Sequence, residues 1–313
     1  MPEVTQVHID AALTNVSLAY RNPNFIADLI APPVAVRKQS DRYFVYDTDR
    51  ERFRSSDDRR APGAEAGEVD FALSNDSYFC EDHALTSVIP DEERENADPA
   101  IQPEIDRVEF LMEKILLNAE IALATAIRTG ASIPNETLSG TGQWSDYTNS
   151  DPVAEVEAHK ATIQDAVQVV PNTLVLAYGV YTKVRLHPKV TDRLPYTHRG
   201  MAGPSALAEL FDVERVLVAR ALQNVAAPGQ TADLDPVWGK DAFLCHVPAR
   251  PAPKRVAFAY TFVWTQAPGG VTGHVVEVWR ENRRKADMLR VQRYYDQKVI
   301  AAGAIYLWKN AVA

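Results

Sequence analysis

The chain has 313 residues, and 46% of them are hydrophobic, which is enough for a large buried core and excludes a disordered chain. A formal net charge of −9 argues against broad binding of nucleic acid through its phosphates, although it does not exclude a locally basic face. Two unclustered cysteines, Cys80 and Cys245, form neither a disulfide framework nor a zinc site, and they fit a reducing compartment.

Residues 1–39 predict an arm rather than a domain. A short amphipathic stretch, Ile9–Tyr20, precedes an apolar segment in which Pro23, Pro32 and Pro33 forbid a continuous helix. An extended apolar segment must lie on a surface, which is either this chain's own core or a neighbouring subunit. The candidates for contact with a neighbouring subunit are Phe25, Ile26, Leu29 and Ile30.

Residues 40–80 predict a long two-stranded hairpin with a charged distal loop. The strand Tyr43–Tyr46 and a returning strand, made of Val69–Leu73 and Tyr78–Cys80, flank this loop, and six acidic residues and six arginines lie between Asp41 and Arg60. Because a lone hairpin is marginally stable in water, this one is either a solvated insertion or packs on a partner, and mixed charge suits a partner. The predicted contact residues are Arg50, Arg52, Arg54, Asp57, Asp58, Arg59 and Arg60.

The longest predicted helix, the spine helix at 99–129, follows an acidic connector at 81–97. Apolar residues from Ile101 to Ala126 recur at spacings of three and four, which places them on one face. The helix begins either at Asp98 with Pro99 or at Gln102 with Pro103, and Gly130 is the expected left-handed cap at its end. An ordinary core helix and the spine of an assembling subunit both fit this pattern.

The second half of the chain has the alternating texture of an α/β domain. A polar loop at 131–150 leads into a helix that begins at Asp151 and reaches roughly to Val170, and a glycine- and proline-rich mobile loop is expected at 194–205. Short helices are expected at 179–186 and 207–211. Strands are expected at 172–177, 214–222, 241–247, 255–264, 274–280, 290–295 and 300–308.

The sequence carries no motif for catalysis, cofactor binding or membrane insertion. GxGxxG after a strand, Walker A, GxSxG, HExxH and CxxC motifs are all absent, and none of the seven histidines has a second ligand at metal spacing. The N-terminus lacks the basic start and apolar run of a signal peptide, and the apolar stretch Ile121–Ile127 is too short to cross a bilayer. We therefore expect no enzymatic activity, cofactor, metal or membrane contact.

The chain resembles the major capsid proteins of tailed bacteriophages, which share the HK97 fold. The resemblance lies in the order of its parts, which are an arm, a long charged hairpin, one spine helix and an α/β domain. The segments that carry the resemblance cover most of the chain. They are 25–47, 60–98, the spine helix, 171–194 and 237–248. The resemblance implies an α+β fold with an N-terminal arm (1–39), an extended loop (40–80), a peripheral domain (81–170), an axial domain (171–285) and C-terminal strands that return to the peripheral domain (286–313).

The function that this resemblance implies is structural. Such subunits self-assemble into hexamers and pentamers of an icosahedral virion shell, which encloses double-stranded DNA without sequence-specific binding and is assembled in the host cytoplasm. Scaffolding, portal and decoration proteins are the expected partners. Because the arm begins almost at Met1, we expect a separate scaffolding protein or an already processed chain. The residues expected near the five- and six-fold axes are His198, Arg199, Gly200 and Gly203.

Two other functions fit less well. An encapsulin-type nanocompartment resembles the same fold and encloses protein cargo, but encapsulins tend to have an N-terminal helix lining the lumen, whereas residues 21–37 are broken by proline. The other alternative is an α/β enzyme with a site that no motif reveals.

Overall fold

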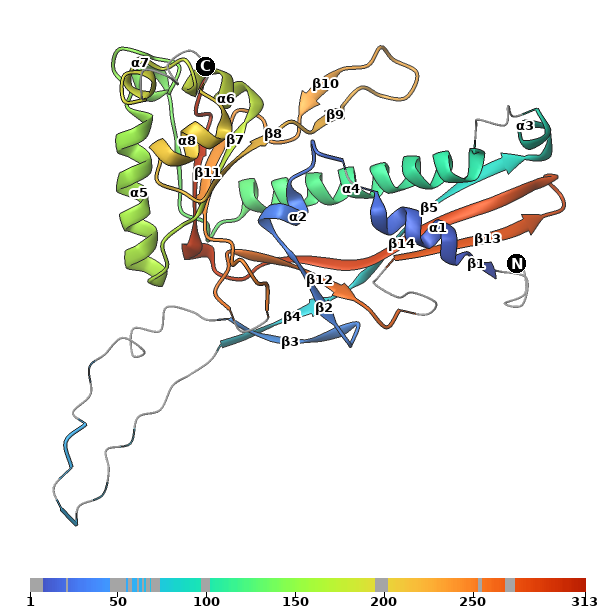
Figure 1. Cartoon of the computed structure of the whole chain (residues 1–313), viewed down its shortest axis with the longest axis horizontal. Coiled ribbons are helices and arrows are strands. Elements are labelled where there is room, and N and C mark those ends of the chain that lie inside the picture. The colour runs from blue at the N-terminus through green and yellow to red at the C-terminus, as the bar shows by residue number, and fades with distance from the viewer. Residues whose placement is uncertain are drawn as a thin grey trace.

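The computed structural model of the chain has two main β-sheets bridged by one long helix (Figure 1). The helix α4 (Pro103–Thr129) runs along the larger sheet and ends beside the smaller one. The structure describes residues 8–20, 22–45, 55, 58–60, 62–63, 65, 68, 74–96, 102–194, 202–252, 255–267 and 274–313.

The larger sheet has six strands, ordered β1-β13-β14-β12-β2, with β5 also paired to β14. Its long central strand β14 has antiparallel partners β13, β12 and β5, whereas β2 runs parallel to β12 at the edge. The strands are β1 (His8–Ile9), β2 (Pro33–Val36), β5 (Glu81–Pro90), β12 (Ala259–Trp264), β13 (His274–Glu281) and β14 (Ala286–Val299).

The apolar face of α4 packs on this sheet, as its periodicity predicts. Val108 and Ile115 of the helix are at most 2% exposed and belong to one core cluster with Leu289 of β14 and Ile89 of β5. The helices α1 (Ala11–Ala19) and α3 (Asp91–Glu95) flank it. No helix among the residues described here is long and apolar enough to cross a membrane.

The two ends of α4 test the predicted caps. Gln102 precedes Pro103 at the first helical position, so the second of the two predicted starts is confirmed. The left-handed cap predicted at Gly130 is wrong, because its φ of −61° and ψ of 111° are extended. Glycine is needed there for close packing instead, since an added Cβ would lie 2.8 Å from the carbonyl oxygen of Ala126.

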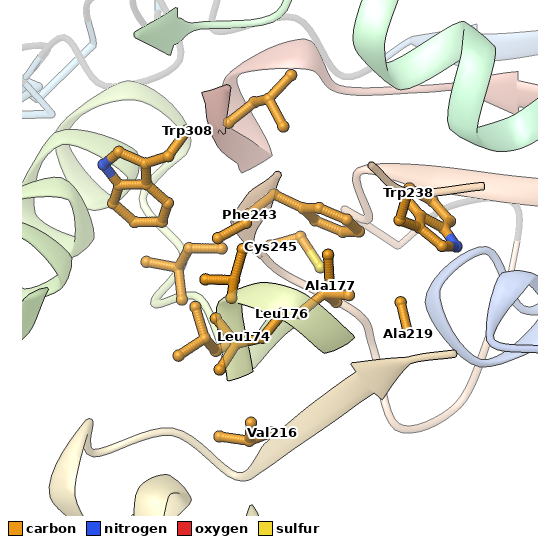
Figure 2. Packing of buried hydrophobic residues seen from close by; sticks show 14 of the residues in the cluster. Leu174, Leu176, Ala177, Val216, Ala219, Trp238, Phe243, Cys245 and Trp308 are labelled. Carbon is orange, nitrogen blue, oxygen red and sulfur yellow. The ribbon is translucent and has the colours of Figure 1, made fainter. Parts of the chain in front are cut away.

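The smaller sheet has five strands, ordered β6-β15-β11-β7-β8. Every residue of its central strands β7 and β11 is buried, as is typical of strands covered on both faces. Figure 2 shows Leu174 and Leu176 of β7 packed with Phe243 of β11, below Trp308 of β15. The strands are β6 (Asn135–Thr137), β7 (Thr173–Ala177), β8 (Arg215–Ala219), β11 (Ala242–Cys245) and β15 (Ile305–Lys309).

Helices surround this smaller sheet, and α2 joins them from the arm (Figure 1). The predicted helix after Asp151 is confirmed, although it ends at Val167, and Val170, expected as an apolar anchor, is 55% exposed. The helices are α2 (Ala27–Ile30), α5 (Pro152–Val167), α6 (Tyr178–Val184), α7 (Pro188–Thr191), α8 (Pro204–Leu210) and the short 3-10 turns Gly140–Gly142 and Ala302–Ala304.

Two hairpins stand apart from the main sheets. The base of the predicted extended loop is confirmed as β3 (Ser40–Val45) paired with β4 (Ser74–Phe79), whereas the predicted strand Val69–Leu73 lies outside the described residues. A second hairpin, β9 (Leu222–Asn224) with β10 (Leu234–Pro236), was not predicted.

Several predicted assignments are wrong. Residues 81–90 form β5 rather than a connector, because they pair with β14 and place Leu85 and Ile89 on one face, toward the core under α4. The polar loop 131–150 contains β6, which pairs with β15 in parallel. The C-terminal strands divide, with β14 in the larger sheet and β15 in the smaller one, and β12 and β13 also lie in the larger sheet.

Candidate subunit interface

The arm divides into residues that its own chain buries and residues that it leaves exposed. Ile26 and Ile30 are 3% and 0% exposed and pack in one cluster with Ile127 of α4, so their side chains contact this chain's own core. Leu29 is 47% exposed, and Phe25 is half-buried against the same cluster. Of the four predicted arm contacts, only Leu29 and Phe25 present surface to a neighbour.

A buried carboxylate fixes the arm to α4. Oε2 of Glu120 accepts from the backbone N–H of Ile26 at 3.0 Å and of Ala27 at 2.7 Å, and Oε1 accepts from Nε1 of Trp238 at 2.6 Å. Glu120 is 0% exposed. Burial raises the pKa of its carboxyl to about 7, while these three hydrogen bonds lower it in part and nearby Asp28 raises it further. One side chain thus joins the arm, the spine helix and the loop after β10.

Sequence reasoning missed Glu120, although a signal was present. Glu120 lies four residues after Leu116 and three before Leu123, so it falls on the widened apolar face of the predicted helix. A lone carboxylate on such a face predicts a buried group with partners, because unpaired buried charge is strongly unfavourable.

A second ionic contact holds the arm to the larger sheet. Nη2 of Arg293 donates to the carboxylate of Asp28 at 3.1 Å, and the Arg293 side chain is only 4% exposed. Its guanidinium lies 4.9 Å from the ring centroid of Tyr295. Asp28 and Arg293 line a cavity of about 670 Å³ between the arm, α4 and the sheet, together with Glu120. The arm is therefore fixed at its middle by two separate polar contacts.

The base of the extended loop packs on the body through aromatic rings. Tyr78 stacks on Phe262 of β12 with 4.6 Å between ring centroids, and Tyr43 lies 5.2 Å from the same ring. The backbone N–H of Phe79 donates to Asp296 at 2.9 Å. The described base of the loop is thus anchored to the body.

The predicted contact residues of this loop are only partly described. Asp58, Arg59 and Arg60 are exposed. Arg50, Arg52, Arg54 and Asp57 lie outside the described residues, so their contact with a partner stays a prediction.

The predicted axial loop is described only at its end. His198, Arg199 and Gly200 lie outside the described residues, whereas Gly203 precedes α8 with an ordinary extended backbone. Ala202 is buried, and its carbonyl accepts from the Tyr181 hydroxyl at 3.4 Å. The described end of the loop is therefore fixed to α6.

An ion-pair network ties the far end of α4 to its neighbours. Arg94 of α3 binds Glu104 at 3.0 Å and Asp287 at 2.6 Å, and Arg107 binds Glu93 at 2.7 Å. A bidentate pair between Arg280 and Asp91 continues the network on β13, at 2.5 and 2.6 Å. These side chains are partly exposed, so each pair contributes little by itself.

One serine–histidine pair invites comparison with a hydrolase but lacks its geometry. Oγ of Ser150 lies 3.1 Å from Nε2 of His187, and Nδ1 of His187 accepts from the backbone N–H of Lys189. Nε2 therefore carries the proton and donates to Ser150, whose hydroxyl donates to the carbonyl of Asp146 at 2.7 Å. His187 therefore cannot accept the hydroxyl proton of Ser150, as the histidine of a catalytic triad does. Both residues are buried, so the pair stabilises a turn.

The described residues contain neither a metal-binding cluster nor a thiol with a lowered pKa. No group of three or more His, Cys, Asp or Glu among the described residues could hold a metal ion. Burial raises the pKa of the Cys80 thiol to about 12 and also raises that of Cys245, so both thiols stay protonated and unreactive.

The chain is similar over nearly its whole length to proteins of known phages. It is 30% identical over 311 residues to the major capsid protein of Pseudomonas phage JBD67, with 97% of each chain covered. It is 26% identical over 311 residues to the major capsid protein of Burkholderia phage BcepMu, with 96% of this chain and 95% of the relative covered. No protein-family model matches the chain.

Solved structures share the arrangement described above. A phage-related protein from Bordetella bronchiseptica RB50 superposes with a TM-score of 0.76 at 23% identity, covering 97% of each chain. The capsid of cyanophage P-SCSP1u gives a TM-score of 0.57 at 10% identity and covers 90% of this chain and 86% of that one. The SrpI encapsulin from Synechococcus elongatus gives 0.50 at 11% identity, covering 96% and 95%.

Proposed function

Because the chain belongs to the family of phage major capsid proteins and has an HK97-type fold, we propose that it builds the hexamers and pentamers of an icosahedral phage head. The observation that carries the proposal is the 30% identity that extends over 97% of both chains. The proteins of this family are structural rather than enzymatic, and a buried serine–histidine pair without a catalytic arrangement agrees with that role.

The proposed peripheral and axial domains correspond to the two main sheets. We assign α4 with the larger sheet to a peripheral domain and the smaller sheet with its helices to an axial domain. The loop at 194–205 would then lie near the five- and six-fold axes. Its Gly200 and Gly203 favour different backbone conformations in hexamer and pentamer copies, because glycine tolerates more states.

The extended loop and the exposed part of the arm are the proposed contacts with neighbours. The loop base is anchored by Tyr43 and Tyr78, so the charged segment beyond it can lie on the next subunit. Leu29 of the arm, 47% exposed, would do the same. Such contacts are heterologous, joining unlike patches head to tail, and they close into rings.

The contents of this shell, its protein partners and its place of assembly are also part of the proposal. The shell would enclose double-stranded DNA without reading its sequence, in a virion assembled in the host cytoplasm. The overall charge of −9 suits a container that does not bind phosphate tightly over its whole surface. Scaffolding, portal and decoration proteins are the expected partners, and no membrane takes part.

A protein-filled nanocompartment is the second candidate function, since an encapsulin shares the fold. What distinguishes the two is the arm. The stretch between α1 and β2 contains Pro23 and Pro32, and Pro33 begins β2. Glu120 holds this stretch on α4, and no long helix forms among its described residues. The match to two phage capsid proteins along almost the whole sequence favours the phage head.

Assembly of the purified chain tests the proposal. The chain, expressed alone and with the scaffolding protein of its phage, is measured by sedimentation velocity and electron microscopy. We expect rings and closed shells of one chain, with or without the scaffold. A stable monomer under both conditions, or a monomer with enzymatic turnover, would overturn the proposed function.

A further inference from the structure

We infer that the hairpin β9–β10 is a head-to-tail contact between copies of this chain: the apolar face of the hairpin packs on an exposed patch formed by Tyr147 and Leu186 of the next copy. The hairpin face is defined by Leu222, Leu234 and Pro236. The inference rests on the proposed function, because it requires that copies of this chain assemble.

The strand register places the three apolar side chains of the hairpin face together. Leu222 pairs with Pro236, and Leu234 pairs with Asn224. Cross-strand partners point to the same side of a ribbon, as do residues two apart, so Leu222, Leu234 and Pro236 share one face with Asn224. The Asn224 side-chain oxygen accepts from the N–H groups of Ala226 and Asp233 within the hairpin. Leu222 is 50% exposed and Leu234 is 60% exposed. Within the described chain these strands pair only with each other, and an isolated two-stranded ribbon is marginally stable in water.

The hairpin is held out on a fixed base. Ala221 before β9 and Val237 after β10 are both buried, and the N–H of Val237 donates to the carbonyl of Ala221 at 3.0 Å. Trp238 follows directly and donates to Glu120 of α4. In Figure 1 the hairpin projects away from the smaller sheet and from α5 and α7. Its apolar face is therefore presented in a defined position.

The residue types of the hairpin favour a protein, rather than nucleic acid or lipid, as its binding partner. Residues 221–236 contain two aspartates and no lysine or arginine. Phosphates of nucleic acid or of anionic lipid are bound through cations, so neither suits this surface. An apolar face without basic groups fits an apolar protein surface. In a shell of one protein, a second copy occupies each contact in the same orientation.

A matching apolar patch lies on another side of the same structural unit. Leu186, just after α6, is 63% exposed, and Tyr147 is 36% exposed. The Tyr147 hydroxyl donates to the carbonyl of Lys183 at 3.3 Å, and its ring meets His187 edge-on at 5.2 Å. Tyr147 is therefore fixed beside the segment that carries Leu186.

The hairpin and the patch lie toward opposite ends of α6, which makes the contact heterologous. Tyr178 at the start of α6 lies 5.8 Å from the guanidinium of Arg220, next to the base of the hairpin. α6 ends at Val184, six residues or roughly 9 Å along the helix from Tyr178, and Leu186 follows two residues later. The hairpin of one copy can therefore contact the patch of the next copy, and this contact can repeat around a ring. Within a single copy the hairpin and the patch do not meet.

Matched variants on the two faces of the hairpin test the inference. Leu222→Ser with Leu234→Ser removes the hairpin face, Leu186→Ser removes the patch, and Val225→Ser is the control. Val225 is 54% exposed and continues the alternation onto the opposite face. We expect the concentration needed for assembly to rise about tenfold or more for the first two and to stay unchanged for the control. Circular dichroism and thermal unfolding should show all three folded, since the changed side chains are exposed.

Mixing the variants shows whether the contact is head to tail. A subunit without the hairpin face still has its patch, and a subunit without the patch still has its hairpin face, so the mixture should form small capped oligomers but no shells. Two results would overturn this inference while leaving the proposed function intact. In the first, the wild-type chain forms shells and both the hairpin-face variant and the patch variant assemble as well as it does. In the second, the control Val225→Ser is impaired as strongly as they are. A wild-type chain that never assembles would overturn the proposed function, and this inference with it.

Discussion

Glu120 shows how one residue can join parts of the chain that are far apart in sequence. It binds two amides of the arm and the indole of Trp238, which lies beyond the hairpin β9–β10. The hydrogen bonds favour the carboxylate, but its removal from water costs more, so the pKa rises to about 7. The arm and the hairpin base are thus stabilised by a group that is itself poorly solvated.

Replacing Glu120 should change both the stability of the chain and its pH dependence. Glu120→Ala leaves three buried donors unpaired and should lower the free energy of unfolding by about 3 kcal/mol or more. The pKa of this carboxyl is 4.5 in the unfolded state and about 7 in the folded state, so between these pH values the folded state binds more protons. The contribution of this protonation to stability is therefore complete below pH 4.5 and is lost as the pH rises through about 7. Glu120→Gln should remove that slope.

Chemical denaturation of the dissociated subunit between pH 4 and pH 8 checks this prediction. The control is Glu109→Ala on the exposed side of the same helix, which should change stability by no more than about 0.5 kcal/mol. Equal losses for the two alanine variants, or an unchanged slope for Glu120→Gln, would contradict it.

At the scale of elements, long periodic segments could be predicted from the sequence and short polar ones could not. The spine helix and the buried strand β7 follow from apolar spacing alone. β6 and β10 are three residues long and exposed, which is too short for an apolar pattern to mark a strand, and their strand geometry depends on their partners. β5 was hidden because the polar residues His83 and Ser87 share the face of Leu85 and Ile89, while Val88 lies on the other face.

The start of α4 is the element in which we predict movement. Shells of this family are expected to assemble as a smaller precursor and then expand. The predicted hinge spans 98–107, of which 98–101 lie outside the described residues. The first turns hold α3 through exposed ion pairs of Glu104 and Arg107, whereas Val108 is the first fully buried residue of the helix. Exposed pairs are worth about 0.2–1 kcal/mol each, so they can exchange as subunits rotate.

Amide exchange on precursor and expanded shells measures this movement. The first hydrogen-bonded amide of α4 is that of Asp106, which donates to the carbonyl of Gln102. We expect protection at 106–107 to be about tenfold lower in the precursor, or ~1.4 kcal/mol of opening free energy, while Val108–Ile127 stays equally protected in both. Equal protection from Asp106 onward in the two states would rule out the hinge.

At the scale of the whole molecule, the order of the elements identified the fold better than any single residue did. The arm, hairpin, helix and α/β texture predicted an HK97-type subunit, yet the sheet to which β12 and β13 belong could not be foreseen. Both strands lie in sequence between β11 and β15 of the smaller sheet, yet they pair with β14 and with the N-terminal strands β2 and β1 in the larger one. Such long-range pairing leaves no local signal.

The charged segment of the extended loop should act on assembly and not on folding. Changing Arg50, Arg52, Arg54, Arg59 and Arg60 together to Glu replaces attraction to acidic groups of a neighbour by repulsion, and we expect shells to be lost while the subunit keeps its melting temperature. One reversal, such as Arg60→Glu, should be tolerated, because an exposed pair contributes at most about 1 kcal/mol. Electron microscopy with thermal unfolding distinguishes these outcomes, and normal shells from the fivefold variant would refute the prediction.

The position of β15 sets the order in which the chain can complete its fold. This strand lies between β6 and β11, and the buried Ala311 beyond it accepts a hydrogen bond from the backbone of Trp144 and donates one to Lys240. Until residues 305–311 leave the ribosome, the smaller sheet lacks an inner strand and β11 keeps an open edge. A subunit synthesised only as far as β14 therefore cannot close this core, and it cannot take its place among other copies before β15 has been added.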